Sequence, residues 1–299
     1  MLFPGSLRAF YEAVRAGSIR GAGDNLSLAP SSVSRQIQLL EHQVGAQLFD
    51  RSAAGVVPTY AGKLVADFAR TVLLDYDSLR ADINDLKGVR RGFIRIAAVE
   101  STISERAVMA ITNFRSKFDG VSFQLRMLPA PKVIEAVKLG EVDVGLTFCA
   151  GPDTELRFLA RFAEPIVLAL APDHPLAAAD SVTLADLKTL PLAMPEPSFG
   201  VRQVLDRAAQ AAGVALTPVL STDSFEALRG FARQGAGGAL LPRLSIAIDR
   251  TLGRLKGVVI DDRALNDTTV DIIALGSRRP SRLLKLFLDE LQRVAKASV

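Results

Sequence analysis

The sequence predicts a mixed α/β protein in three parts: a small, mainly helical N-terminal domain, one long helix, and a larger domain of strands and helices. Three observations predict this fold class. Apolar residues recur at helical spacing before residue 45, recur every seven residues from 65 to 86, and form short alternating runs from residue 93 onward. With 299 residues, of which 49% are hydrophobic and 23% charged, the chain is long enough for two packed domains.

Two short helices are expected first. Ser6 can cap a helix that ends before Gly17, and its apolar residues follow the i, i+3, i+4, i+7 pattern: Leu7, Phe10, Tyr11 and Val14. Ser18 can cap a second, shorter helix that reaches Leu26. The first helix should contribute core side chains.

A third helix is predicted from Pro30, which suits a first helical turn, to just before Gly45, which suits the position after a helix end. Its apolar stripe comprises Val33, Ile37, Leu40 and Val44, and its opposite face comprises Ser31, Arg35, Gln38 and His42. The tight connector before this helix makes the pair a helix-turn-helix. Serine, arginine and glutamine suit base edges and phosphates in a major groove. On these residues alone, a solvated surface helix is the simpler interpretation.

A β-hairpin should follow. Residues 47–51 and 56–57 are expected to form two short strands joined by residues 52–55, which would be a wing beside the helix-turn-helix. Arg51 then lies where a wing can meet a phosphate, although a solvated surface arginine would look the same.

The long helix should begin at Thr59 and reach about Lys87. Its heptad seam comprises Val65, Val72, Leu79 and Leu86, with Ala69, Tyr76 and Ile83 four residues after the first three. Pairing with the same helix of a second subunit would bury this narrow stripe. Packing against the chain's own C-terminal domain is the alternative.

This N-terminal region resembles the LysR-type transcriptional regulators. The resemblance lies in Leu7, Phe10, Gly17-Ser18, Ala22, Leu26, Val33 to Ile37, Leu40-Glu41, Gly45, Leu48-Phe49, Arg51, Thr59 and Ala61-Gly62. Two features depart from the family pattern: Pro30 replaces a usual glutamine that helps to contact bases, and Gly21 and Gly23 flank Ala22 in a usually alanine-rich helix. The resemblance implies that the long helix dimerises. The DNA-binding residues that we expect are Ser31, Ser32, Ser34, Arg35, Gln36, Gln38 and Arg51.

Beyond a hinge at residues 88–92, strands and helices alternate. A first set is expected at 93–99, 103–118, 121–128, 132–139 and 142–148, and a second at 166–170, 192–194, 201–212, 225–234 and 239–241. The last strand, 269–275, and helix, 281–296, have no local sheet. If they return to the first set, the chain crosses twice and leaves a cleft between two lobes.

The resemblance implies that these lobes form a periplasmic-binding-protein-like effector domain. The expected boundaries are 1–58 for the winged helix-turn-helix, 59–89 for the linker helix and 90–299 for the effector domain. Lobe I would span about 90–163 and 266–299, and lobe II about 164–265.

Four loops could reach the cleft: residues 100–102, 147–148, 195–200 and 221–224. Simple helix capping explains two of them equally well. Hydroxyl groups beside helix N-termini favour an anion, so a carboxylate is one expected ligand, while a neutral or aromatic ligand stays open. The family's metabolite ligands are often carboxylates or aromatics. The expected effector-binding residues are Ser101, Thr102, Thr147, Phe148, Phe199 and Thr222.

Other classes of function find little support. Cys149 is the only cysteine, and we expect it to be a small core residue. One cysteine and two histidines make a zinc centre improbable. Phosphate-cradling glycine motifs and a GxSxG elbow are absent from the sequence, so we expect neither an enzyme nor a cofactor. Residues 235–238 should be a turn after a helix. The first residues do not resemble an export signal and no apolar run approaches a membrane span, which predicts a cytoplasmic protein.

The sequence therefore predicts a LysR-like regulator whose binding to double-stranded operator DNA, or whose activation of transcription, responds to a small-molecule effector. A homodimer or homotetramer is expected, and RNA polymerase is a further candidate partner. The alternative is an architectural DNA-binding protein whose C-terminal domain only oligomerises. A solute-binding transport protein is a third class, which the N-terminal helix-turn-helix opposes.

Overall fold

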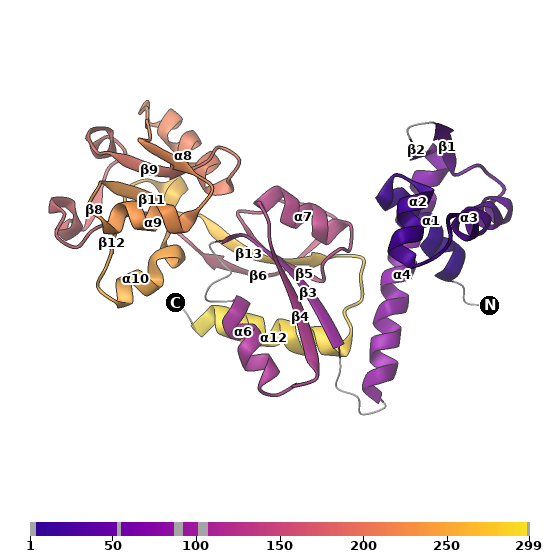
Figure 1. Cartoon of the computed structure of the whole chain (residues 1–299). Helices are drawn as coiled ribbons and strands as arrows, with labels where there is room; N and C mark the ends of the chain where they lie inside the picture. The colour runs from indigo at the N-terminus through magenta and orange to yellow at the C-terminus, as the bar shows by residue number, and fades with distance from the viewer. Residues whose placement is uncertain (1–3, 53–54, 87–91, 101–106, 298–299) are drawn as a thin grey trace. The chain divides into compact units, whose positions relative to one another are not determined.

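The structure is a computed structural model that describes residues 4–52, 55–86, 92–100 and 107–297. The chain divides into two compact units, residues 1–89 with 277–283 and residues 90–276 with 284–299. Within the described residues, no helix is both long and apolar enough to cross a membrane. Each unit is described separately below (Figure 1).

The first unit is a helix-turn-helix with a hairpin and a long helix. Its elements are α1 (Pro4–Ala16), α2 (Ile19–Leu26), α3 (Pro30–Val44), β1 (Phe49–Ser52), β2 (Gly55–Pro58) and α4 (Tyr60–Leu86). The two strands pair antiparallel, as a wing requires. Buried side chains from three of these elements meet in one core, where the rings of Phe10 and Phe49 lie 5.0 Å apart and Ile37 packs with them. The predicted winged helix-turn-helix is therefore confirmed.

Local capping explains where these helices begin and end. The Ser18 side chain accepts a hydrogen bond from Gly21 N, and Pro30 occupies the first turn of α3. Gly45 ends α3 with a left-handed φ of 74°, a conformation that costs glycine little. Thr59 Oγ1 accepts from Gly62 N at 3.0 Å, which confirms it as the cap of α4.

Two expectations in this unit are wrong. The first helix begins at Pro4, whose fixed φ suits a first turn, so Ser6 is a buried residue inside the helix instead of its cap. Val44 is 45% exposed, because α3 ends there and only Val33, Ile37 and Leu40 of the stripe are buried.

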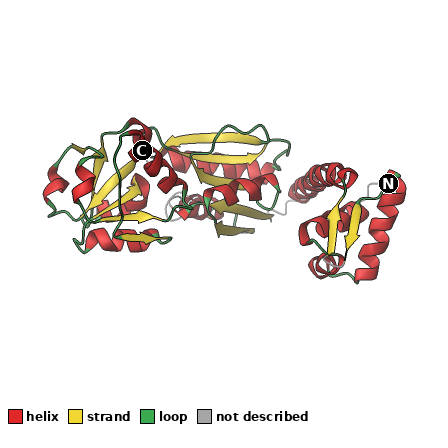
Figure 2. Cartoon of the chain, turned by 90° about the horizontal axis from the view of Figure 1, so that it is seen from above, coloured by secondary structure: helices red, strands yellow, loops and turns green. Residues whose placement is uncertain are grey.

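The second unit contains two lobes, each built on its own sheet (Figure 2). Lobe I has a five-stranded sheet in the order β4-β3-β5-β13-β6. Its elements are β3 (Gly92–Ala98), α6 (Val108–Arg115), β4 (Val121–Met127), α7 (Ala130–Lys138), β5 (Val144–Phe148), β6 (Leu156–Ala163), β13 (Thr269–Leu275) and α12 (Arg282–Ala297). Helix α7 covers one face of the sheet, and α6 and α12 cover the other (Figure 1). Phe287 of α12 contacts Phe114 of α6 at 5.4 Å between ring centres.

Lobe II has a six-stranded sheet in the order β10-β9-β11-β7-β12-β8. Its strands are β7 (Ile166–Leu170), β8 (Ser181–Val182), β9 (Leu192–Pro195), β10 (Leu220–Thr222), β11 (Gly238–Pro242) and β12 (Lys256–Ile260). Its helices are α8 (Gly200–Ala211), α9 (Phe225–Arg233), α10 (Ala247–Thr251) and α11 (Arg263–Asn266), with short 3-10 turns at η2 (Pro175–Ala178), η3 (Asp186–Thr189) and η4 (Arg243–Ile246). Strands β7, β9 and β11 are buried along their whole length.

The chain crosses between the lobes twice, at Glu164–Pro165 and again at Asp267–Thr268. The prediction that the last strand returns is confirmed, because β13 pairs antiparallel with β5 and β6. The two crossings are bonded to each other. Glu164 N donates to Thr268 O at 2.8 Å, and Thr268 Oγ1 donates to Glu164 O at 2.6 Å. Both side chains are buried. The hinge between the lobes therefore consists of two segments that are hydrogen-bonded to each other.

Cys149 is not the core residue that its chemistry suggests. It follows β5 in a left-handed conformation, with a φ of 48°, and this backbone turn leaves the residue exposed. Its sulfur accepts a hydrogen bond from Thr269 N at 3.4 Å. The segment 235–238 is, as expected, the turn after α9, with Gly235 at a φ of 68°.

Candidate functional site

The first candidate site is the outer face of α3. Ser31, Ser32, Arg35 and Gln38 are exposed, whereas Ser34 and Gln36 are half-buried. The opposite face fixes the helix, since Val33 and Ile37 are fully buried in the core. The exposed residues therefore share one polar, positively charged side of a helix whose orientation the core determines.

The end of α3 is tied to the hairpin. Glu41 Oε1 accepts a hydrogen bond from Leu48 N at 2.9 Å, just before β1. Arg51 lies in β1 with its backbone paired to Val56, while its side chain lies outside the described residues. This tie couples the position of the wing to the position of α3, as a two-part DNA contact requires.

The second candidate site is a pocket of about 300 Å³ between the lobes of the second unit. Lobe I contributes residues at and just after the ends of β3, β4 and β5, and lobe II contributes the loops before α8 and α9. The lining comprises Val99, Glu100, Met127, Leu128, Pro129, Ala130, Phe148, Glu196, Ser198, Phe199, Gly200, Val201, Asp223 and Phe225. Its position at the carboxyl ends of parallel strands is where α/β folds bind ligands.

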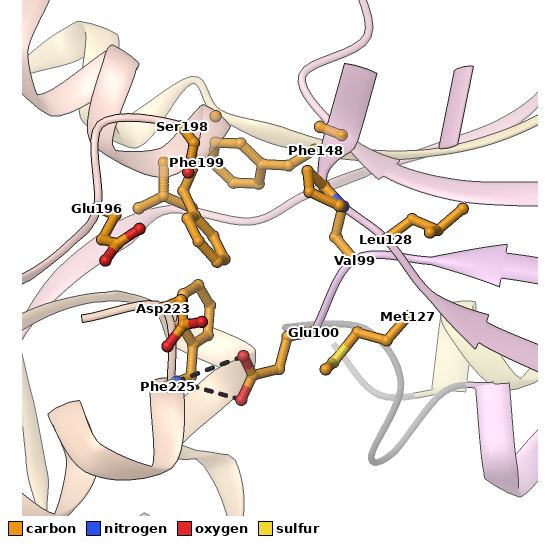
Figure 3. Close-up of a pocket in the computed structure, with 14 residues that line it drawn as sticks. Val99, Glu100, Met127, Leu128, Phe148, Glu196, Ser198, Phe199, Asp223 and Phe225 are labelled. Carbon is orange, nitrogen blue, oxygen red and sulfur yellow. Dashed lines mark hydrogen bonds between the residues drawn. The ribbon is translucent and has the colours of Figure 1, made fainter. Parts of the chain in front are cut away.

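Glu100 joins the two lobes across this pocket (Figure 3). Its carboxylate extends from the end of β3 and accepts from Phe225 N, at 3.2 and 3.4 Å to its two oxygens. That N–H is one of the free donors at the start of α9. Burial raises the pKa of Glu100, the bond from Phe225 N and the charge of Arg229 oppose the rise, and the charges of Asp223 and Glu226 add to it.

Aromatic and aliphatic side chains form the rest of the wall. The rings of Phe199 and Phe225 lie 5.7 Å apart, and Phe148 is buried where β5 ends. In Figure 3, Glu196, Phe199 and Asp223 lie on one side of the pocket, with Val99, Leu128 and Met127 on the other. The pocket thus combines an apolar surface with three carboxylates.

Only some of the expected effector residues line the pocket. Phe148 and Phe199 line the pocket, and Ser101 and Thr102 lie outside the described residues. Thr147 is fully buried in β5 and does not line the pocket, and its hydroxyl has no hydrogen-bond partner among the described residues. Thr222 does not line it either, because its Oγ1 accepts from Ser224 N at 3.1 Å and so caps a turn.

The loops that the sequence predicts at the cleft do line the pocket, and so do Phe148 and Phe199, but the acidic lining residues were not predicted. Glu100, Glu196 and Asp223 lie in three of the four loops that the sequence analysis placed at the cleft, and each lines the pocket. The signal that could have found them is that every one of these three loops carries an acidic residue. Met127 and Leu128 gave no such signal, because they lie at the end of β4, which was not expected at the cleft.

Comparison with known proteins decides the family. The family model described as the LysR substrate binding domain matches residues 87–296. The model described as the bacterial regulatory helix-turn-helix protein, lysR family, matches residues 5–63. The chain belongs to the LysR family.

Individual relatives and solved structures agree with this assignment. An uncharacterized HTH-type transcriptional regulator of Mycobacterium tuberculosis is 31% identical over 283 residues, which cover 91% of this chain and 90% of the relative. The RuBisCO operon transcriptional regulator of Allochromatium vinosum is 28% identical over 249 residues, 83% of this chain and 82% of that protein. Full-length OxyR from Pseudomonas aeruginosa, with a cysteine substituted, has the same fold, with a TM-score of 0.75, 17% identity and coverage of 99% and 97%.

This LysR-family protein is thus a DNA-binding transcriptional regulator with an effector-binding domain, and it is not an enzyme. The first unit is the helix-turn-helix part of that description. The second unit, with the pocket between its lobes, is the part that responds to an effector.

Proposed function

We propose that this LysR-family regulator binds operator DNA as a homodimer, and that a small molecule held between lobes I and II changes this binding. The observation that carries the proposal is the combination, in one chain, of an exposed polar helix face on a helix-turn-helix and a ligand-sized pocket bridged by Glu100. The regulator would act in the cytoplasm, where bacterial operator DNA is found.

The proposed DNA contacts are Ser31, Ser32, Ser34, Arg35, Gln36 and Gln38 of α3, with Arg51 of the wing. Arg35 is the strongest candidate for contact with a base, since an exposed guanidinium can bond two acceptors of guanine at once. The half-buried Ser34 and Gln36 can contribute only through their outer atoms. The basic and acidic residues of the helix-turn-helix nearly balance, so doubling of the contacts by a second subunit has to supply part of the affinity.

The proposed dimer contact is an apolar stripe on α4 that keeps Val72, Leu79 and Ile83 of the predicted heptad seam. Val65 packs against the core of the helix-turn-helix and Ala69 is fully buried, so neither belongs to this stripe. Leu64, Phe68, Leu79 and Ile83 are 57%, 61%, 51% and 43% exposed. At about 100° of rotation per residue, these four positions fall within about 100° of arc, together with Val72. Large apolar side chains concentrated on one side of a helix mark an interaction surface. Two such helices, one from each subunit, would bury each other's apolar stripe. A homotetramer or contact with RNA polymerase would need further surfaces.

The proposed effector response follows from the two-lobe arrangement. The lobes are connected by the two hydrogen-bonded crossings at Glu164 and Thr268. They are connected again at the pocket by the hydrogen bond from Phe225 N to Glu100. A ligand that touches both lobes binds one arrangement of the lobes more tightly than others and so shifts the population towards it. The expected effector residues that meet this requirement are Phe148 of lobe I and Phe199 of lobe II.

The test of DNA binding is Arg35→Ala. We expect operator affinity at fixed salt to fall about 5- to 150-fold, the range for loss of a base contact worth about 1–3 kcal/mol. The matched control is Arg263→Ala, which removes the same charge from a side chain that is 93% exposed on α11. Wild-type affinity in Arg35→Ala would refute the assignment of α3, and an equal loss in the control would show that net charge alone is responsible.

The test of the pocket is Gly200→Leu. A Cβ at this position would lie 3.6 Å from Phe148 Cδ1, an ordinary contact, and the rest of the leucine would fill the cavity. We expect this variant to bind operator normally but to lose the effect of cell metabolites on operator binding. A metabolite response that persists in Gly200→Leu would place the effector elsewhere.

A further inference from the structure

The charged side chains that the structure describes around the pocket are all acidic. Glu100, Glu196 and Asp223 are the charged side chains among the described lining residues, and lysine and arginine do not occur there. Glu196 and Asp223 are exposed and form no ion pair with any described residue. Three carboxylates around one cavity favour a positively charged occupant, because such a ligand relieves their mutual repulsion.

Two described arginines close to lining residues, Arg229 and Arg202, offset these carboxylates only in part, because other acceptors hold them. Arg229 donates to Glu226 Oε2 and to Ser245 O, at 2.6 and 3.0 Å. Arg202 donates to Asp206 Oδ1 at 2.8 Å and to Pro195 O at 3.0 Å. Neither lines the pocket. A ligand carboxylate would therefore meet like charges without a described cation to receive it.

The remaining surface specifies an apolar body. Phe148, Phe199 and Phe225 present aromatic rings, and Met127, Leu128 and Val99 present aliphatic surface. Aromatic faces also attract ammonium groups, which adds to the effect of the carboxylates. A metal ion alone would leave this apolar surface unused, whereas an organic cation uses both parts.

We propose that the pocket binds an organic cation, a protonated amine or quaternary ammonium group on an apolar or aromatic body. The proposal rests on the proposed role of the pocket as the effector site, and it replaces the carboxylate that the sequence alone favoured. The ammonium group lies among Glu100, Asp223 and Glu196, and the body lies against Phe148, Phe199 and Met127. The pKa of Glu100, raised by burial and by Asp223, falls when the cation binds.

The test compares probes that share one skeleton. 2-Phenylethylammonium, its N,N,N-trimethyl derivative, 2-phenylethanol and 3-phenylpropanoate are titrated into the full-length wild-type protein by calorimetry at low salt. We expect each cation to bind at least tenfold more tightly than the carboxylate, with the alcohol between them. Equal or tighter binding of the carboxylate, or binding by neither cation, overturns the proposal.

The variant Glu196→Gln with Asp223→Asn keeps the shape of the pocket and removes two charges. We expect the preference for cation over carboxylate to fall at least tenfold in this variant and to stay unchanged in Asp173→Asn with Asp180→Asn, which removes two exposed charges elsewhere on lobe II. A preference that survives the first double substitution overturns the proposal.

Gly200→Leu separates failure of the ligand class from failure of the proposed function. If the carboxylate or the alcohol binds best and this variant abolishes that binding, the pocket is still the effector site and only the ligand class is wrong. If the best ligand binds Gly200→Leu as well as wild type, the pocket is not the site and both proposals fail.

Discussion

Thr268 offers a direct test of the hinge between the lobes. Its side chain is 2% exposed, and its hydroxyl lies 2.6 Å from Glu164 O and 2.9 Å from Leu265 O. The hydroxyl therefore bonds the second crossing to the first. Thr268→Val keeps the shape and replaces the donor with a methyl group, so the carbonyl oxygens lose a buried partner.

The expected cost follows from these contacts. One neutral hydrogen bond contributes about 1 kcal/mol, and a buried carbonyl left without its donor adds a comparable desolvation penalty. We therefore expect Thr268→Val to lower the free energy of unfolding by about 2 kcal/mol, a change of about 30-fold in the folded-to-unfolded ratio. Thr251→Val is the matched control. Its hydroxyl donates to Ala247 O at 3.0 Å on an exposed helix, where the same substitution should cost less than about 0.5 kcal/mol.

Urea unfolding followed by far-UV circular dichroism measures this difference, since the chain contains no tryptophan for fluorescence. The transition of the two-lobed unit should move to lower urea in Thr268→Val with an unchanged slope. Hydrogen exchange at Glu164 N, which donates to Thr268 O, should accelerate in parallel. A stability loss no larger than that of Thr251→Val would refute the idea that the hydroxyl links the crossings.

Three further predictions concern other parts of the chain. Gly62→Ala should destabilise the helix-turn-helix by about 1–3 kcal/mol in thermal unfolding, because its Cβ would lie 2.1 Å from the carbonyl oxygen of Leu48. Leu79→Glu with Ile83→Glu should shift the protein towards monomers in light scattering without unfolding it, and an unchanged oligomer would remove the role of α4. Hydrogen bonds from Arg293 and Lys117 lower the pKa of Glu290 below 4.5, so this group's contribution to stability is present above pH 4.5 and is lost as the pH falls through the lowered value. Glu290→Gln should make the free energy of unfolding depend less on pH below pH 4.5. An unchanged pH dependence in this range would contradict the proposed contribution of Glu290.

The N-terminal fold was predictable because its signals are local. Ser18, Pro30, Gly45 and Thr59 each act within one turn of their own position, so caps and helix ends follow from the sequence. The errors arose where tertiary contacts determine where a helix begins and which side chains are buried. Ser6 has the chemistry of a cap but is buried inside α1, which begins two residues earlier.

The two-lobed unit was predictable in outline, but four of its strands, β6, β8, β10 and β12, were not predicted. Strand β6 was missed because its burial does not alternate, and its pairing with β13 shifts register between Ile272 and Ile273. Strand β12 was missed because it contains Gly257, whose site leaves no room for a side chain beside Ile246. Buried strands such as β7 give an uninterrupted apolar run and were found with their ends correct.

The chemistry of the pocket shows why location is easier to predict than ligand class. Loop positions follow from the order of strands and helices, whereas the side chains that face the cavity depend on backbone turns. Thr222 and Asp223 are adjacent in one loop, yet the hydroxyl of Thr222 caps a turn while Asp223 lines the pocket. Hydroxyl groups and helix N-termini favour an anion, but the sequence does not show that Asp223, and not Thr222, is directed into the cavity.

Glu100 can couple ligand binding to the arrangement of the two lobes. Its carboxylate can bond the N-terminus of α9 in lobe II, contact a ligand cation, or do both, and these choices differ in free energy. The crossings at Glu164 and Thr268 are hydrogen-bonded to each other, so we expect a change at Glu100 to rotate one lobe against the other about the hinge. A cation that binds beside Glu100 without displacing Phe225 N would stabilise the joined arrangement, whereas one that displaces it would favour a more open arrangement. Glu100→Gln keeps an acceptor for Phe225 N but removes the charge. It should therefore preserve the joining of the lobes while weakening cation binding, and loss of both together would show that the two roles of this carboxylate are inseparable.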